Sequence, residues 1–232
     1  MPNIKELYAE HPEYIYYMEC STDNDTPLPI LSHIINNTLT LANYTLSSGH
    51  CKGLNTAAKY LQTNINRVRF DNCGIDDLEM SNLLQAFVKF KDFKSIIYRH
   101  NELSEFSLKW LAKLLAKSIP YHLQELRISG CRLTPECTSQ LIEVISKRSY
   151  LKQFELSKAL MSDDDALGIA EYAMNSKNLE DLDLSANDLL PKAMDIFWSL
   201  IRENRKLLFL NISHNNLIEG NSGNNELVVQ AT

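Results

Sequence analysis

The chain has 232 residues, a formal net charge of −6 and 44% hydrophobic residues. This acidic balance argues against non-specific nucleic-acid binding, which requires a strongly basic surface. The N-terminal residues lack the pattern of a secretory signal, and no run approaches the roughly 20 apolar residues of a membrane-spanning helix.

Residues 1–35 precede any repeated pattern and are expected to form an N-terminal cap. They contain a cluster of tyrosines, a turn-rich stretch at 21–25, two prolines and an apolar stretch at 30–35; the tyrosines are Tyr8, Tyr14, Tyr16 and Tyr17. A repeat protein must cover the apolar face of its first unit. The alternative is that the tyrosines form a docking surface.

Residues 36–217 repeat the pattern L-x-x-L-x-L-x-x-N/C-x-L. The segment from Leu179 to Leu189 fits it at every defined position. Further copies, two of them degenerate, place the starts at 36, 65, 93, 123, 151, 179 and 207, so the spacings are 29, 28, 30, 28, 28 and 28. Self-similarity at this period indicates a solenoid of about seven units.

Each copy is expected to begin with a strand and a structural turn. Apolar residues at the fourth and sixth positions alternate with polar ones, which is the period of a half-buried strand. The ninth position follows the strand, where a buried Asn or Cys can bond to turn backbone groups. This structural ladder comprises Cys73, Asn101, Cys131, Asn187 and Asn215.

The spacers between strands are expected to be helices. Residues 104–115 place apolar side chains three and four residues apart after a serine cap. Pro135 and Pro191 stand near helix starts, and Asp163 to Asp165 suit the positive end of a helix dipole. The longer, 30-residue copy coincides with residues 119–122, which predict a lengthened helix exit.

These repeats resemble those of the ribonuclease-inhibitor-like leucine-rich-repeat family. The resemblance implies an α/β horseshoe with a parallel sheet on the concave face and helices on the convex face. Members of that family include ribonuclease inhibitors, tropomodulin-like actin cappers and ciliary dynein-regulatory-complex subunits. Its motifs are specific to the fold and not to one function.

Residues 218–232 are expected to be a polar C-terminal tail. The seventh copy therefore has a strand but no helix. Either its last strand is a sufficient lid, or a partner, a second copy or a further part of a longer protein covers it.

The concave face is expected to carry the third, fifth and seventh positions of each copy. Positive charge gathers in the early strands and negative charge in the later ones. Neighbouring charges can simply neutralise each other; the functional alternative is a bipolar groove that binds a protein. The candidate partner-binding residues, with two apolar anchors among them, are Arg67, Arg69, Ile97, Arg99, Glu125, Arg127, Glu155, Asp181, Asp183 and Phe209.

No catalytic, metal or cofactor motif is recognisable. The five cysteines form no CxxC pair, which favours a reducing, cytoplasmic compartment. His100 and His214 occupy equivalent places but are separated by several strands at ~5 Å each, too far to share a metal. The acidic run at 163–165 is better explained by helix-end charge than by a cation site.

The sequence therefore predicts a non-enzymatic scaffold or adaptor without cofactors that binds a protein partner. By resemblance, such a chain would belong to a larger cytoplasmic assembly, for example cytoskeletal or ciliary. The alternative function is regulation of an enzyme, as in Ran GTPase-activating proteins of the same repeat class. Those proteins have a markedly acidic tail, which is not matched here.

Overall fold

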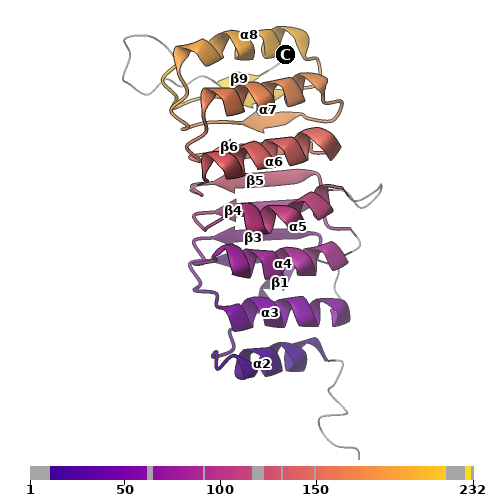
Figure 1. The fold of residues 1–232 in the computed structure, drawn as a ribbon. Helices are drawn as coiled ribbons and strands as arrows, with labels where there is room; N and C mark the ends of the chain where they lie inside the picture. The colour runs from indigo at the N-terminus through magenta and orange to yellow at the C-terminus, as the bar shows by residue number, and fades with distance from the viewer. Residues whose placement is uncertain are drawn as a thin grey trace, which may run out of the picture.

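The computed structural model describes residues 11–61, 65–90, 92–116, 123–131, 133–148, 150–217 and 228–230. Strands and helices alternate along the chain and stack in chain order, from α2 at the bottom of Figure 1 to α8 at the top. The predicted alternation of strand and helix is thus confirmed. The expected helix exit at 119–122 and the tail residues 218–227, 231 and 232 lie outside the described residues.

One sheet of nine strands runs the length of the stack, in the order β1 to β9. Its seven middle strands are parallel neighbours: β2 Thr38–Ala42, β3 Arg67–Asp71, β4 Ser95–Arg99, β5 Glu125–Ser129, β6 Gln153–Ser157, β7 Asp181–Asp183 and β8 Phe209–Asn211. Each begins at the third position of its copy, where the pattern places it. The strands β1 (Ile34–Ile35) and β9 (Val228–Gln230) pair antiparallel at the two ends.

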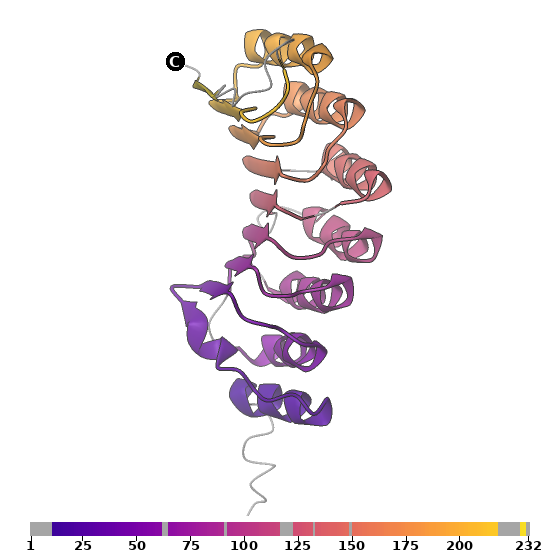
Figure 2. The same ribbon diagram turned by 90° about the vertical axis from the view of Figure 1, so that its left-hand side faces the viewer.

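The helices form a single layer on one side of this sheet (Figure 2). They are α3 Ser48–Ala57, α4 Asp77–Lys89, α5 Glu105–Leu115, α6 Pro135–Arg148, α7 Asp163–Asn175 and α8 Met194–Glu203, with α2 Pro12–Thr22 before them. A crossover helix is the ordinary way to join parallel strands. The other side of the sheet carries no α-helix in the described part of the chain, and we call it the open face.

The core lies between the sheet and the helix layer. The fourth and sixth positions of the copies point into it, so Val68 and Phe70 of β3 are almost fully buried. Phe70 stacks on Phe87 of α4, whose ring centroid lies 4.8 Å from that of Phe93. Burial of these large rings supplies much of the favourable free energy of folding.

The ninth positions form hydrogen bonds between successive units. The Asn101 side-chain oxygen accepts from the backbone N–H of Cys73 at 2.8 Å, and Asn187 accepts likewise from Ala159 at 2.9 Å. Asn215 accepts from the N–H of Asn187 at 2.9 Å. The thiol of Cys73 donates to a carbonyl oxygen of the preceding strand at 3.4 Å. All five cysteines are buried free thiols.

The residue just before each ninth position has a left-handed backbone, a feature that the sequence analysis did not predict. Its φ lies between 50° and 64° in seven successive copies, at Asn43, Asn72, His100, Gly130, Lys158, Ala186 and His214. This conformation turns the chain from the strand towards the core and costs most residues some strain. At Gly130 a Cβ would also lie 2.6 Å from the His100 ring, so a side chain there would meet both the strained backbone and that ring.

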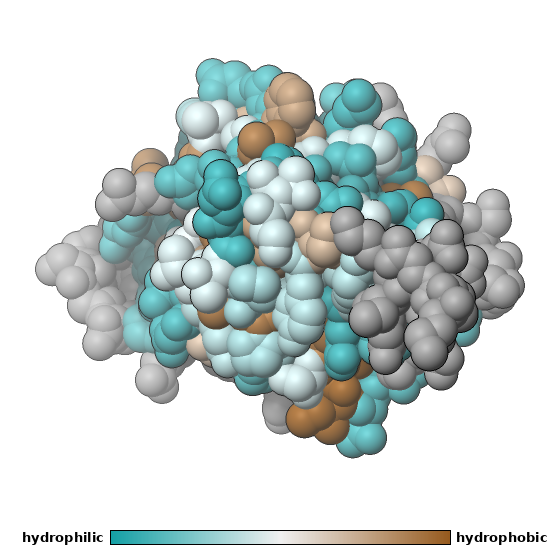
Figure 3. All heavy atoms as spheres, turned by 90° about the horizontal axis from the view of Figure 1, so that it is seen from below, coloured by the Kyte–Doolittle hydropathy of each residue, from teal (hydrophilic) through white to brown (hydrophobic). Residues whose placement is uncertain are grey.

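The N-terminal end is closed by α2, which packs on α3. Tyr16 is buried, whereas Tyr17 is 46% exposed. Close approach of the two helices depends on Gly53, where a Cβ would lie 2.8 Å from Cδ2 of Tyr16. Seen from this end, the surface in Figure 3 is mostly pale or teal, with hydrophobic residues confined to separate patches.

A carboxylate joins this end to the first repeat. Oδ2 of Asp25 accepts from the Ser47 hydroxyl at 2.6 Å and from the Gly49 N–H at 2.9 Å, both at the start of α3. These bonds satisfy donors that a helix start otherwise leaves unpaired. They hold the pKa of Asp25 below its ordinary value, chiefly through the Ser47 bond.

Candidate functional site on the open face

The parallel register places the candidate residues in rows across the open face. The middle row runs from Arg69 of β3 through Ile97, Arg127, Glu155 and Asp183 on the next four strands. Two flanking rows contain the remaining candidates. Charges of both signs therefore stand on adjacent strands about 5 Å apart.

The centre of the open face is a network of charged side chains that bond to one another. Nε of Arg127 donates to Glu125 at 2.7 Å, and Nη2 donates to Asp181 at 3.1 Å. Nη1 of Arg127 lies 3.5 Å from Oε2 of Glu155, and Nη2 of Arg99 donates to the same oxygen at 3.3 Å. We call Arg99, Glu125, Arg127, Glu155 and Asp181 the central charge cluster.

Burial makes this cluster a largely internal feature of the molecule. Glu155 is only 5% exposed, and the Arg127 side chain is 22% exposed. Burial opposes the charge of Arg127, but the bond to Glu125 and the surrounding carboxylates raise its pKa above the ordinary value. Burial raises the pKa of Asp181, and Arg127 counteracts only part of that rise.

Serines complete the polar contacts of the cluster. The Ser95 hydroxyl donates to Glu125 at 2.6 Å, and the Ser157 hydroxyl lies 2.9 Å from Oε1 of Glu155 and 2.7 Å from the Ser129 hydroxyl. These serines are themselves buried. The sequence analysis missed their role, although small hydroxyl residues beside a charged strand position are the available signal.

The N-terminal part of the open face keeps exposed positive charge. Arg67 is exposed and makes no ion pair among those that the described residues form. Arg69 is exposed and lies 3.4 Å from Asp71, which also pairs with His100 at 3.0 Å. Half-buried Ile97 stands between Arg69 and Arg127 on adjacent strands.

The C-terminal part is polar and less charged. Asp183 accepts from the Asn211 side chain at 2.8 Å and from Ser185 at 2.7 Å. Phe209 is half-buried beside Asp181 on the adjacent strand. All ten candidate residues thus lie on the open face. The charged ones at its centre pair with each other, whereas Arg67 and Arg69 are the exposed cations of that set.

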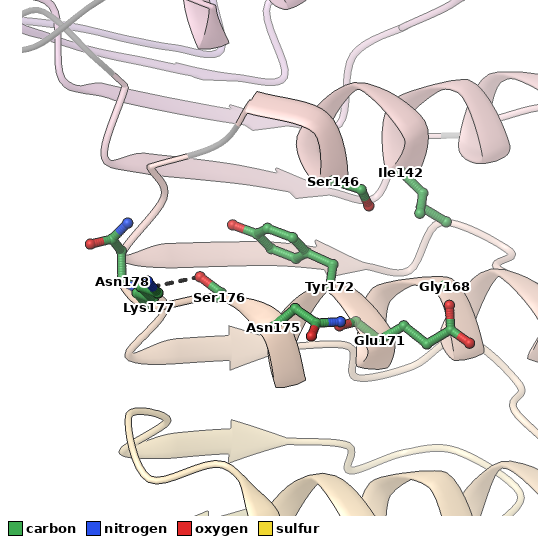
Figure 4. A pocket seen from close by; sticks show the side chains of 9 residues that line it. All are labelled: Ile142, Ser146, Gly168, Glu171, Tyr172, Asn175, Ser176, Lys177 and Asn178. Carbon is green, nitrogen blue, oxygen red and sulfur yellow. Dashed lines mark hydrogen bonds between the residues drawn. The ribbon is translucent and has the colours of Figure 1, made fainter.

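A pocket lies between α6 and α7, on the helix side (Figure 4). It has a volume of about 450 Å³ and is lined by Ile142, Ser146, Gly168, Glu171, Tyr172, Asn175, Ser176, Lys177 and Asn178. The Ser176 hydroxyl there accepts from the N–H of Asn178 at 3.3 Å.

The described residues contain no group of three His, Cys, Asp or Glu side chains that could hold a metal ion. Among the same residues, no helix combines the length and apolar character needed to cross a membrane.

No protein-family model matches the chain. It is 24% identical over 180 residues to the human NACHT, LRR and PYD domains-containing protein 5, an alignment that covers 77% of this chain and 15% of that protein. The chain therefore spans less than a sixth of that relative's length. Together with the parallel strand–helix repetition, the similarity supports a leucine-rich-repeat-like character and a protein-interaction domain.

Proposed function

We propose that the chain is a non-catalytic protein-binding module of the ribonuclease-inhibitor-like leucine-rich-repeat type, and that it binds its partner on the open face. The observation that carries this proposal is the uneven pairing of charge on that face. The charged side chains of the central charge cluster pair with one another, whereas Arg67 and Arg69 are exposed on the neighbouring strand.

The partner segment that suits this arrangement is acidic with an apolar residue beside the charge. Arginine pairs with carboxylates through two parallel hydrogen bonds. Ile97, one strand away from Arg69, supplies an apolar contact next to that pair. Complementary charge of this kind increases specificity and association rate more than affinity.

The test is selection of peptides from a displayed random library by the wild-type chain, followed by titration of the selected peptides. The variant Arg67→Glu with Arg69→Glu is compared with Lys109→Glu with Lys113→Glu on α5, which changes the net charge equally. Arg99 is left unchanged because a glutamate there would stand beside the buried Glu155.

We expect the selection to enrich acidic peptides. Their affinity is expected to fall at least roughly tenfold for the double variant of Arg67 and Arg69 on β3, and to change little for the double variant of Lys109 and Lys113 on α5. Equal losses in both variants would show non-specific charge attraction. Peptides without acidic residues, or peptides whose binding ignores both variants, would place the binding surface elsewhere.

A further inference from the structure

The last helix that the structure describes, α8, presents an aromatic side chain at a repeat position that is buried in three of the earlier helices. Trp198 occupies the same repeat position as Leu84 of α4, Ile142 of α6 and Ala170 of α7, which are buried. Trp198 is 47% exposed. The difference arises because a following helix packs on α4, α6 and α7, whereas no described helix packs on the outer side of α8 (Figure 2).

Two further apolar residues break the polar pattern of the repeat, one in the sixth copy and one in the seventh. Leu190 is 51% exposed at a position that is Ser, Thr or Asp in the five preceding copies. Leu208 is 55% exposed where the six preceding copies have Asn, Asn, Lys, Gln, Lys and Glu. Exposed apolar side chains of this size at one end of a stack indicate an interaction surface.

The charged residues on either side of Trp198 indicate which partner can pack on α8. Asp195, Trp198 and Arg202 are spaced three and four residues apart, so they form one stripe along α8, and all three are exposed. The stripe is acidic at its N-terminal end and basic at its C-terminal end. If two copies of α8 pack antiparallel about a two-fold axis near Trp198, Asp195 of each copy faces Arg202 of the other.

We infer that α8 is a self-association surface through which two copies of this chain join end to end. A two-fold interface requires a patch that is complementary to itself, and the Asp195–Trp198–Arg202 stripe meets this requirement. The sheet edge at the same end is already paired, because β9 lies antiparallel on β8. The contact therefore forms through the helix layer and leaves the open face of both copies accessible.

The test measures the molar mass of the 232-residue chain by sedimentation over a dilution series. Two charge reversals are made separately, Asp195→Arg and Arg202→Asp. Each alone places like charges opposite each other twice in the dimer and is expected to raise the Kd by at least roughly tenfold. An equimolar mixture of the two variants restores both opposite-charge contacts and is expected to recover dimerisation.

The apolar contact has its own variant and control. Trp198→Ala is expected to give a monomer, whereas Phe106→Ala on α5, where Phe106 is 68% exposed, is expected to leave the dimer intact. Circular dichroism establishes that each variant is folded. In a Trp110→Phe background, the emission of Trp198 is expected to shift to shorter wavelength as the concentration rises.

A wild-type chain that stays monomeric over the whole dilution series would overturn the inference and would leave a different protein as the occupant of α8. A dimer that persists in all three variants would overturn it as well, and would place the contact elsewhere. Failure to recover dimerisation in the mixture would exclude the antiparallel arrangement. None of these outcomes depends on Arg67 or Arg69, so the function proposed for the open face is tested separately.

Discussion

Arg99 on β4 and Glu155 on β6 form an ion pair across the intervening strand, with Nη2 and Oε2 3.3 Å apart. The same carboxylate oxygen lies 3.5 Å from Arg127 of β5. Glu155 is thus a buried anion held by two cations from two different strands. Removal of either cation leaves it undercompensated, which is costly in an environment of low polarity.

Arg127→Met is therefore expected to lower the free energy of unfolding by about 2 kcal/mol, since the pair is only partly buried. Urea denaturation measures the loss. Arg67→Met is the matched control, because Arg67 is exposed and the change there is expected to stay within about 0.5 kcal/mol. Equal effects of the two substitutions would contradict a structural role for the central charge cluster.

Asn187→Ala is expected to cost about 2 kcal/mol, because several buried backbone groups lose their partner. Its side-chain oxygen accepts from the Ala159 N–H, and its nitrogen donates to the carbonyl oxygen of Leu156 at 2.7 Å. Thermal and urea unfolding measure the change. Asn175→Ala on α7 removes one exposed hydrogen bond and serves as the control. An equal loss of unfolding free energy in this control would contradict a stabilising role for the ladder.

Glu79→Gln is expected to alter how stability depends on pH. Burial and the neighbouring Asp76 carboxyl raise the pKa of Glu79 to about 7 from its ordinary 4.5. Between these two values the folded state binds more protons than the unfolded state, so the wild type loses stability as pH rises through this window. Glutamine retains the capping geometry without titrating.

The stability of the wild type relative to Glu79→Gln is thus expected to fall by roughly 1 kcal/mol from pH about 4.5 to pH about 7.5, after allowance for solvent screening. Urea unfolding at several pH values measures it. Glu136→Gln, in the first turn of α6 and exposed, is the control. A parallel pH dependence for wild type and Glu79→Gln would exclude the raised pKa.

Gly53→Ala is expected to destabilise the packing of α2 on α3 and so to lower the free energy of unfolding. The new methyl group would lie 2.8 Å from the Tyr16 ring and 3.1 Å from its carbonyl oxygen, so overpacking of about 1–3 kcal/mol outweighs the gain in helix propensity. Urea unfolding of a double-mutant cycle with Tyr16→Ala measures the coupling, because the clash shrinks once the ring is gone. If the changes in unfolding free energy caused by Gly53→Ala and Tyr16→Ala were strictly additive, the close contact between the two residues would be contradicted.

The repeat pattern was sufficient to predict the strands and the helix layer. Period-2 burial and a fixed spacing act locally, so Val68, Phe70 and their equivalents could be placed in the core from sequence alone. The helix expected at 104–115 is observed at Glu105–Leu115. The strands, the helices and their buried positions depend on the order of apolar and polar residues, which can be read directly from the sequence.

The pairing within the open face could not be predicted in the same way. Strand positions place Arg99 and Glu155 on one face, but the side-chain conformations that join them across β5 depend on the three-dimensional arrangement. The left-handed turns at Lys158 and Ala186 also escaped prediction, because these residue types seldom adopt positive φ. Their conformation is imposed by the stacking of the copies.

Ala159 stands at the ninth position of the fifth copy, so the ladder of Asn and Cys side chains is interrupted there, with a mechanical consequence. A force that pulls the two ends of the stack apart acts on every junction between neighbouring strands, because each unit contacts only its neighbours. The methyl side chain of Ala159 can form no polar link back to the preceding unit, yet on the opposite side of the same strands Arg127 ties β5 to β6 and β7. At this junction ionic contacts therefore add to the backbone pairing of β5 with β6, in place of the amide bond that Asn101, Asn187 and Asn215 supply elsewhere.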